Sequence, residues 1–181
     1  MLGTLITSKT RIKLLLKFFL NANNTGYLKN LEQEFEDSSN GIRIELNKFE
    51  NAGLLKSESV GNKKIFKANI KHPLYDDIHS IIMKYAGIDQ IIENVIERLG
   101  NVYSVYLIGS FAKGLETKNI EIALIGDINT EYLSNLISKA EPIIKKKIDF
   151  VHYQLEDFVG NEKNILPKDH LLIWKKEDQL L

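Results

Sequence analysis

The sequence predicts an α+β protein with two differently patterned parts. Apolar residues recur at helical spacing through most of residues 8–52, and two short strand-like runs follow over residues 55–68. From residue 102 onward, apolar runs of strand length are bounded by turn residues, which is typical of a mixed α/β domain. The pattern changes near residue 72, which predicts a domain over residues 1–72, a helical linker or dimerisation segment over residues 73–99, and a second domain over residues 100–181.

Composition excludes several classes of protein. The 181 residues are 44% hydrophobic, enough for one large core or two small ones, and they include no cysteine, so disulfides and zinc fingers are excluded. No apolar run approaches the roughly 18 residues that a membrane span needs, and the N-terminal residues lack a basic leader segment and a small-residue cleavage site. We therefore expect a cytoplasmic protein with no membrane partner.

Charge is unevenly distributed along a chain whose net charge is zero. Residues 1–72 contain 12 Lys/Arg and 7 Asp/Glu, whereas the remainder contains 12 and 17. A basic part followed by an acidic part suggests that only the first part meets nucleic acid.

Three helices and a hairpin are predicted in the first part. Apolar stripes predict helices over residues 8–20, 28–35 and 40–52, and Gly53 provides a C-terminal stop for the third. Two runs separated by a Gly-Asn turn then predict a β-hairpin over residues 55–68. This order is that of a winged helix-turn-helix, in which one helix enters the major groove and a basic hairpin contacts phosphates.

The outer face of the third helix carries side chains suited to reading DNA. Arg43 can bind guanine in a bidentate manner, whereas Asn40 and Asn47 suit adenine. An ordinary solvated helix face is the alternative, but the adjoining basic hairpin favours contact with DNA. The predicted DNA-binding residues are Ser39, Asn40, Arg43, Asn47, Lys48, Lys56, Lys63 and Lys64.

Residues 8–75 resemble ArsR-type winged-helix transcriptional regulators, on the strength of the segment over residues 41–55, the hairpin, and the segment over residues 67–75. The resemblance implies binding to double-stranded DNA. Apolar positions at helical spacing continue through the linker, where they would serve either domain packing or a dimer interface. We expect a homodimer, because two-fold DNA sites suit two readers.

A turn in the second part suggests phosphate binding. An apolar run over residues 102–108 predicts a buried strand, and Gly109-Ser110 predicts a sharp exit into a helix whose free backbone N–H groups could hold a phosphate. The predicted nucleotide-binding residues are Gly109, Ser110, Lys113 and Gly114.

Three residues are candidate metal ligands. Asn119 and Glu121 begin the next strand and share one of its faces, where a pair of aspartates would hold Mg²⁺. Asp149 lies in another strand-like run, over residues 145–153, and is expected to approach them in space. Because Asn119 is neutral and Glu121 is one methylene longer than aspartate, we expect weaker metal binding than at an all-aspartate site.

These residues resemble the minimal nucleotidyltransferase-like domain, whose pattern is a G-S motif, an S-D-x-D strand and a later aspartate. The matching residues are Gly109, Ser110, Gly114 and Asp149. Lys118, Asn119 and Glu121 replace the S-D-x-D part, which predicts that transferase activity is lost. The residues alone establish no cofactor, and the resemblance implies Mg²⁺ and a nucleoside triphosphate as candidate ligands.

The two parts together predict a sequence-specific DNA-binding transcriptional regulator that occludes a promoter as a dimer. Its nucleotidyltransferase-like domain would then be an inactive scaffold or a nucleotide sensor. Two alternatives stay open. One is an active Mg²⁺-dependent nucleotidyltransferase with Glu121 and Asp149 as its catalytic residues, and the other is an antitoxin-like protein-interaction module.

Overall fold

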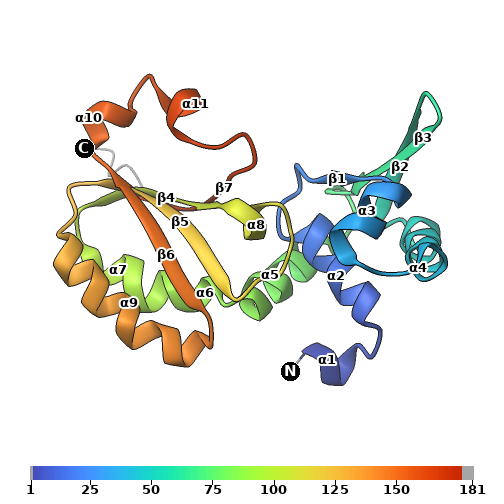
Figure 1. Cartoon of the computed structure of the whole chain (residues 1–181), viewed down its shortest axis with the longest axis horizontal. Helices are drawn as coiled ribbons and strands as arrows, with labels where there is room; N and C mark the ends of the chain where they lie inside the picture. The colour runs from blue at the N-terminus through green and yellow to red at the C-terminus, as the bar shows by residue number, and fades with distance from the viewer. Residues whose placement is uncertain (1, 177–181) are drawn as a thin grey trace. The chain divides into compact units, whose positions relative to one another are not determined.

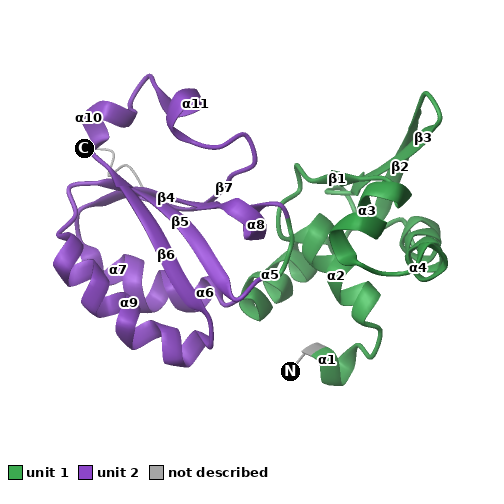
Figure 2. Ribbon diagram, viewed as in Figure 1, with its two compact units in different colours: residues 1–86, 114–116 green, residues 87–113, 117–181 purple. Residues whose placement is uncertain are grey.

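The computed structural model describes residues 2–176 and divides the chain into two compact units (Figures 1 and 2). Unit 1 comprises residues 1–86 and 114–116, and unit 2 comprises residues 87–113 and 117–181. Both units contain helices and strands, so the predicted mixture of α and β structure is confirmed. No helix in the described range is both long enough and apolar enough to cross a membrane.

Unit 1 combines helices with a small antiparallel sheet (Figure 1). Its elements are α1 (Leu2–Leu5), α2 (Lys9–Phe19), β1 (Thr25–Gly26), α3 (Leu28–Phe35), α4 (Ser39–Asn51), β2 (Leu55–Val60), β3 (Lys63–Ala68) and α5 (Tyr75–Ala86). The sheet order is β1-β3-β2. The predicted helices and hairpin are therefore present, and β1 is an addition that the sequence pattern did not indicate.

The core of unit 1 is built around α2, in which residues 14–19 are all buried, as is Leu20 directly after it. Each large apolar side chain in this stretch contributes about 1.5–3 kcal/mol by leaving water. The helices begin at serine caps: the Ser8 hydroxyl accepts a hydrogen bond from the Arg11 backbone N–H, and the Ser38 hydroxyl accepts one from Gly41. Gly26 allows β1 to approach α3 closely, because a Cβ there would lie 2.9 Å from a Leu31 methyl group.

A partly buried ion pair joins α2 to α4. The Arg11 guanidinium donates to both carboxylate oxygens of Glu45, at 2.7 and 3.1 Å, and the Glu45 side chain is only 9% exposed. The hydrogen bond from Arg11 holds the pKa of the Glu45 carboxyl below its usual range, against the opposing effect of burial. Bidentate pairing of this kind fixes the relative orientation of the two helices as well as their separation.

Unit 2 is a four-stranded sheet with helices on its two faces (Figure 1). Its elements are α6 (Ile88–Ile91), the π-helical turn η1 (Ile92–Ile96), α7 (Glu97–Leu99), β4 (Val102–Ile108), α8 (Gly109–Ala112), β5 (Asn119–Gly126), α9 (Thr130–Ile144), β6 (Lys147–Tyr153), α10 (Leu155–Phe158), α11 (Glu162–Ile165) and β7 (Leu171–Lys175). The sheet order is β6-β5-β4-β7, with β5 and β6 parallel and the other pairs antiparallel.

Alternation along β5 separates the two faces of this sheet. Ala123 and Ile125 pack with Phe158 of α10, while Ile120 and Ile122 point to the opposite face, which α6, α7 and α9 cover (Figure 1). All four of these β5 residues are buried. At the start of β5, Asn119 is exposed and Glu121 is half-buried.

The helix predicted after the Gly109 turn is short. The helix after the Gly109 turn is α8, a single turn of four residues. It ends because the Lys113 N–H bonds back to the Ser110 carbonyl and the chain then turns at Gly114, whose φ is +73°. Such a short helix adds little dipole to a phosphate site, so any anion there depends on individual N–H groups and side chains.

We predict that Glu45→Gln destabilises unit 1 by about 1–3 kcal/mol near neutral pH, because the charge-assisted hydrogen bonds to Arg11 are weakened. A carboxyl whose folded-state pKa is lowered stabilises the fold above its ordinary pKa of 4.5 and loses that contribution as the pH falls. The difference between wild type and variant should therefore shrink at about pH 3.5. Amide hydrogen exchange in α2 and α4 measures it.

Glu58→Gln is the control, because the Glu58 side chain is 60% exposed and makes only a 3.9 Å contact with Lys67. If Glu45→Gln lowered the free energy of unfolding by no more than Glu58→Gln does, the structural role of the ion pair would be contradicted.

Candidate functional site

The turn between β4 and α8 places a carboxylate beside a glycine. Gly109 has a φ of +66°, in the left-handed region that favours glycine, and its neighbour Ile108 pairs with Glu121 across the β4–β5 ladder. The Glu121 carboxylate fills the space that a Cβ at position 109 would need, with Oε2 2.7 Å from that position. The extra methylene of glutamate therefore brings the carboxylate back over the Gly109 turn.

The three predicted metal-ligand positions lie together at the end of the sheet where β5 begins. Glu121 and Asp149 are register partners in the parallel β5–β6 ladder, so their side chains share one face. The Asn119 amide nitrogen donates a 2.7 Å hydrogen bond to Asp149 Oδ2. The sequence-based expectation that Asp149 approaches the start of β5 is thus met by both the register and a direct side-chain contact.

Charge at this end of the sheet is only partly balanced. Within residues 2–176, the half-buried Glu121 carboxylate has no hydrogen bond or ion pair, and Asp149 is bound through the neutral Asn119 amide. The nearby Lys147 is engaged elsewhere, because its ammonium group lies 2.7 Å from Glu141. Two carboxylates on one face with no lysine or arginine between them favour a cation.

The donor set fits a divalent cation that prefers oxygen. Carboxylate oxygens of Glu121 and Asp149 and the amide oxygen of Asn119 are hard ligands of the kind that Mg²⁺ and Mn²⁺ take. Across the described residues, however, no three His, Cys, Asp or Glu side chains come together as a metal-ligand group. Two carboxylates suit one ion better than the pair of ions used in two-metal phosphoryl transfer.

The other predicted nucleotide-binding residues are placed differently. Ser110 is half-buried, and its hydroxyl has no hydrogen-bond partner within the described part of the chain. Lys113 is exposed and lies 4.0 Å from Asp169, a contact too open to hold its side chain firmly. Gly114 belongs to unit 1, where a Cβ would lie 2.8 Å from the Leu16 carbonyl oxygen, so packing against α2 is sufficient reason for glycine.

The predicted DNA-binding residues of unit 1 fall into two groups. Engaged within the unit are Ser39, whose hydroxyl donates to Glu32, and the lysines at 48 and 64, which lie 3.1 Å from Glu45 and 2.6 Å from Glu50. Exposed and without a polar partner in the described range are Asn40, Arg43, Asn47 and Lys56. Lys63 is also exposed, with its ammonium group 4.4 Å from the centre of the Tyr27 ring.

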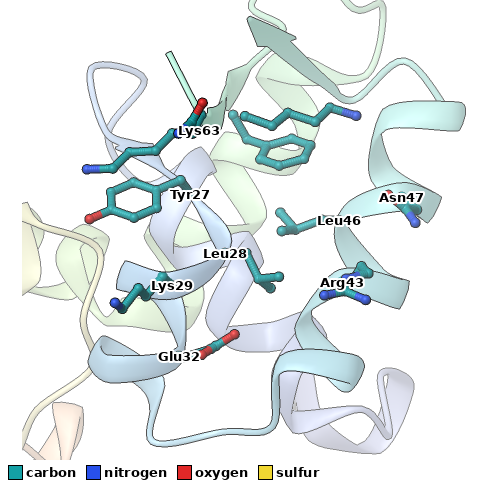
Figure 3. Close-up of a pocket in the computed structure, with 11 residues that line it drawn as sticks. Tyr27, Leu28, Lys29, Glu32, Arg43, Leu46, Asn47 and Lys63 are labelled. Atoms are coloured by element: carbon teal, nitrogen blue, oxygen red, sulfur yellow. The ribbon is translucent and has the colours of Figure 1, made fainter. Parts of the chain in front are cut away.

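A pocket of about 700 Å³ opens beside Arg43, between α3, α4 and the β2–β3 hairpin (Figure 3). Leu28 and Leu46 face one another across it, from α3 and α4. Sequence reasoning singled out Arg43, Lys63 and Lys64 as DNA contacts but did not predict a pocket. The available signal was the aromatic and apolar pair Tyr27-Leu28 at the start of a helix.

We predict that Gly109→Ala destabilises unit 2 by more than the about 1–3 kcal/mol of strain expected for a non-glycine residue at positive φ. The added methyl group must also displace the Glu121 carboxylate. Gly100→Ala is a matched control, because Gly100 has a φ of +81° and nothing lies within 4 Å of its Cβ position. In the double variant with Glu121→Ala, the loss of stability should fall to that of the control, because no carboxylate has to be displaced.

Urea unfolding followed by fluorescence of Trp174, the single tryptophan of the chain, measures these differences in unit 2. Two results would contradict the packing of the Glu121 carboxylate on the turn. Either Gly109→Ala and Gly100→Ala lower the free energy of unfolding equally, or the effects of Gly109→Ala and Glu121→Ala simply add in the double variant.

The second part of the chain is similar to a known family. Residues 90–178 match the family model described as Polymerase beta, Nucleotidyltransferase. No curated protein matches the chain.

Solved structures give weaker likenesses. One described as a nucleotidyltransferase from Sulfolobus solfataricus is 26% identical, with 56% of this chain and 88% of that chain covered and a TM-score of 0.37. Reduced HlyU from Vibrio cholerae N16961 is 14% identical, with 48% and 83% covered and a TM-score of 0.37. A mutant of the toxin–antitoxin pair MntA-HpeT is 18% identical, with 50% and 73% covered and a TM-score of 0.39. The family match covers just under half of the chain and shows that residues 90–178 are similar in sequence to nucleotidyltransferases.

Proposed function

We propose that unit 2 binds a nucleoside triphosphate together with one divalent cation and acts as a nucleotidyltransferase. The observation that carries the proposal is the position of the Glu121 carboxylate. It lies against the Gly109 turn and beside Asp149, half-buried and without a cationic partner among the described residues, in a domain that matches the nucleotidyltransferase model. A triphosphate could approach two carboxylates only if a cation lay between them.

Each residue at this end of the sheet has a distinct role in the proposal. Glu121 and Asp149 would hold the cation, with the Asn119 amide oxygen as a neutral third ligand. The free Ser110 hydroxyl would donate a hydrogen bond to a phosphate oxygen, next to the backbone N–H groups that follow Gly109. A bound cation would supply the positive charge that offsets the charge developing on the phosphate oxygens during transfer.

The residues that depart from the family pattern should weaken cation binding at this site without abolishing it. The hydrogen bond from Asn119 to Asp149 replaces the repulsion that a third carboxylate would cause, at the cost of one negative charge for binding cations. We therefore expect weaker cation binding and slower transfer than at an all-aspartate site.

Calorimetry of ATP with Mn²⁺ or Mg²⁺ tests the binding. Asp149→Ala and Ser110→Ala should each weaken nucleotide binding by about tenfold or more, because each removes a charged or hydrogen-bonded contact to the cation or phosphate. Asn119→Asp combined with Glu121→Asp should instead tighten it. Asp157→Ala is the control, since this exposed aspartate lies on α10, away from the site.

Transfer is measured separately, by incubating the wild-type protein with α-labelled ATP and total cell extract and following the label into protein and nucleic acid. Binding with no transfer by either the wild type or the double aspartate variant would show a nucleotide sensor instead of a transferase. Absence of any cation-dependent ATP binding would overturn the proposal.

A second proposed function concerns unit 1, which we infer to contact double-stranded DNA. Its order of three helices and a hairpin is that of a winged helix-turn-helix, and Arg43 and Asn47 stand one turn apart on the exposed side of α4 without polar partners in the described range. A homodimer would suit a two-fold site and remains an expectation, as does the antitoxin-like alternative. A gene for a small helical toxin beside this one would favour that alternative.

Sheared genomic DNA captured by the full chain tests this second function. Wild type should enrich a few upstream regions, and Arg43→Ala should abolish the enrichment because it removes a base-edge contact. Lys56→Ala should weaken retention of all sequences alike and reduce the dependence on salt, as expected for a phosphate contact. Retention of no DNA, or equal retention by wild type and Arg43→Ala, would exclude sequence reading by α4.

A further inference from the structure

The pocket of unit 1 has the dimensions of a small-molecule site. Its volume of about 700 Å³ lies within the range of about 300–1,000 Å³ that is usual for ligand pockets in proteins. It is formed by α3, α4 and the hairpin, elements that pack into one compact unit. The pocket is therefore a feature of a folded unit and does not depend on the nucleotide site of unit 2.

The floor of the pocket is apolar. Leu46 and Phe66, which are 2% and 4% exposed, line it, and Leu28 faces Leu46 across the opening (Figure 3). The Tyr27 ring extends this surface beneath the hairpin. Such a floor favours a ligand with an apolar body, because covering it removes carbon surface from water on both sides.

The rim of the pocket is basic. Lys29, Arg43, Lys63 and Lys64 line it, against a single carboxylate, that of Glu32. The Glu32 carboxylate already accepts the hydrogen bond from the Ser39 hydroxyl. The surplus of positive charge favours a negatively charged ligand.

Arg43 is the cation best placed to bind that charge. Lys64 is paired with Glu50 at 2.6 Å and Lys63 lies over the Tyr27 ring. Lys29 and Arg43 are exposed and have no polar side-chain partner within residues 2–176. A guanidinium presents two parallel N–H groups that match the two oxygens of a carboxylate.

We propose that this pocket binds a small organic carboxylate with an apolar body, its carboxylate on Arg43 and its body on Leu28, Leu46 and Phe66. This binding site does not depend on DNA binding by the same face. If the face also binds DNA, the ligand would compete with DNA for Arg43, and ligand binding would release the protein from the DNA.

Calorimetry of the full chain at fixed ionic strength tests the proposal with three carboxylates of different shape: benzoate, indole-3-acetate and octanoate. At least one should bind with a Kd below about 100 μM. The neutral amide of the same compound should bind about tenfold or more weakly, since it keeps the body and loses the charge. The corresponding amine should not bind.

Variants separate the two halves of the site. Arg43→Ala should weaken binding of the carboxylate by about tenfold and leave binding of the neutral amide unchanged. Leu28→Ser should weaken carboxylate and amide alike, because it removes part of the apolar floor. Lys56→Ala removes a positive charge from the same hairpin without touching the pocket and should change neither.

Failure of all three carboxylates to bind, equal binding of carboxylate and amide, or equal effects of Arg43→Ala and Lys56→Ala would overturn the proposal. Each substituted residue is exposed or half-buried, so we expect the variants to fold. Hydrogen exchange checks this before the titration.

Discussion

The candidate nucleotide site depends on the register of β5 between its two neighbours. Antiparallel pairing sets Glu121 opposite Ile108, next to Gly109, and parallel pairing sets it opposite Asp149. A shift of one residue would turn Glu121 toward the helices and bury a carboxylate in the apolar core. The buried isoleucines and leucine of β5 prevent that shift, so the core of unit 2 and the geometry of its site are specified by the same pairing.

The substitutions at this site are coupled to one another. Asn119 donates to Asp149 and so tolerates the absence of a cation, which a third carboxylate at that position would not. The Glu121 side chain is long enough to lie over Gly109, which leaves room for the carboxylate because glycine has no Cβ. Under the proposed function, these two residues would lower the affinity for a cation and would reduce repulsion between carboxylates when no cation is bound.

Several features of both units followed from sequence, and others did not. The hairpin runs, the strands beginning at Val102 and Asn119, and the approach of Asp149 were predicted, because strand periodicity and turn residues are local signals. The helix α9 was missed although Leu133, Leu136 and Ile137 stand at helical spacing, with Pro142 inside it as a misleading breaker. The engagement of Ser39 and Lys64 by glutamates could not be predicted, because those partners are brought together only by the tertiary fold.

In the proposed site, Glu121 and Asp149 together hold one cation at the Gly109 turn. Crystals of the full chain grown with Mn²⁺ and a non-hydrolysable ATP analogue test this by anomalous scattering. We expect one Mn²⁺ peak, with oxygens of Glu121, Asp149 and the phosphates at about 2.1–2.3 Å from the ion. Nucleotide bound without an ion between these carboxylates and the phosphates, or an ion at another place in the chain, would contradict it.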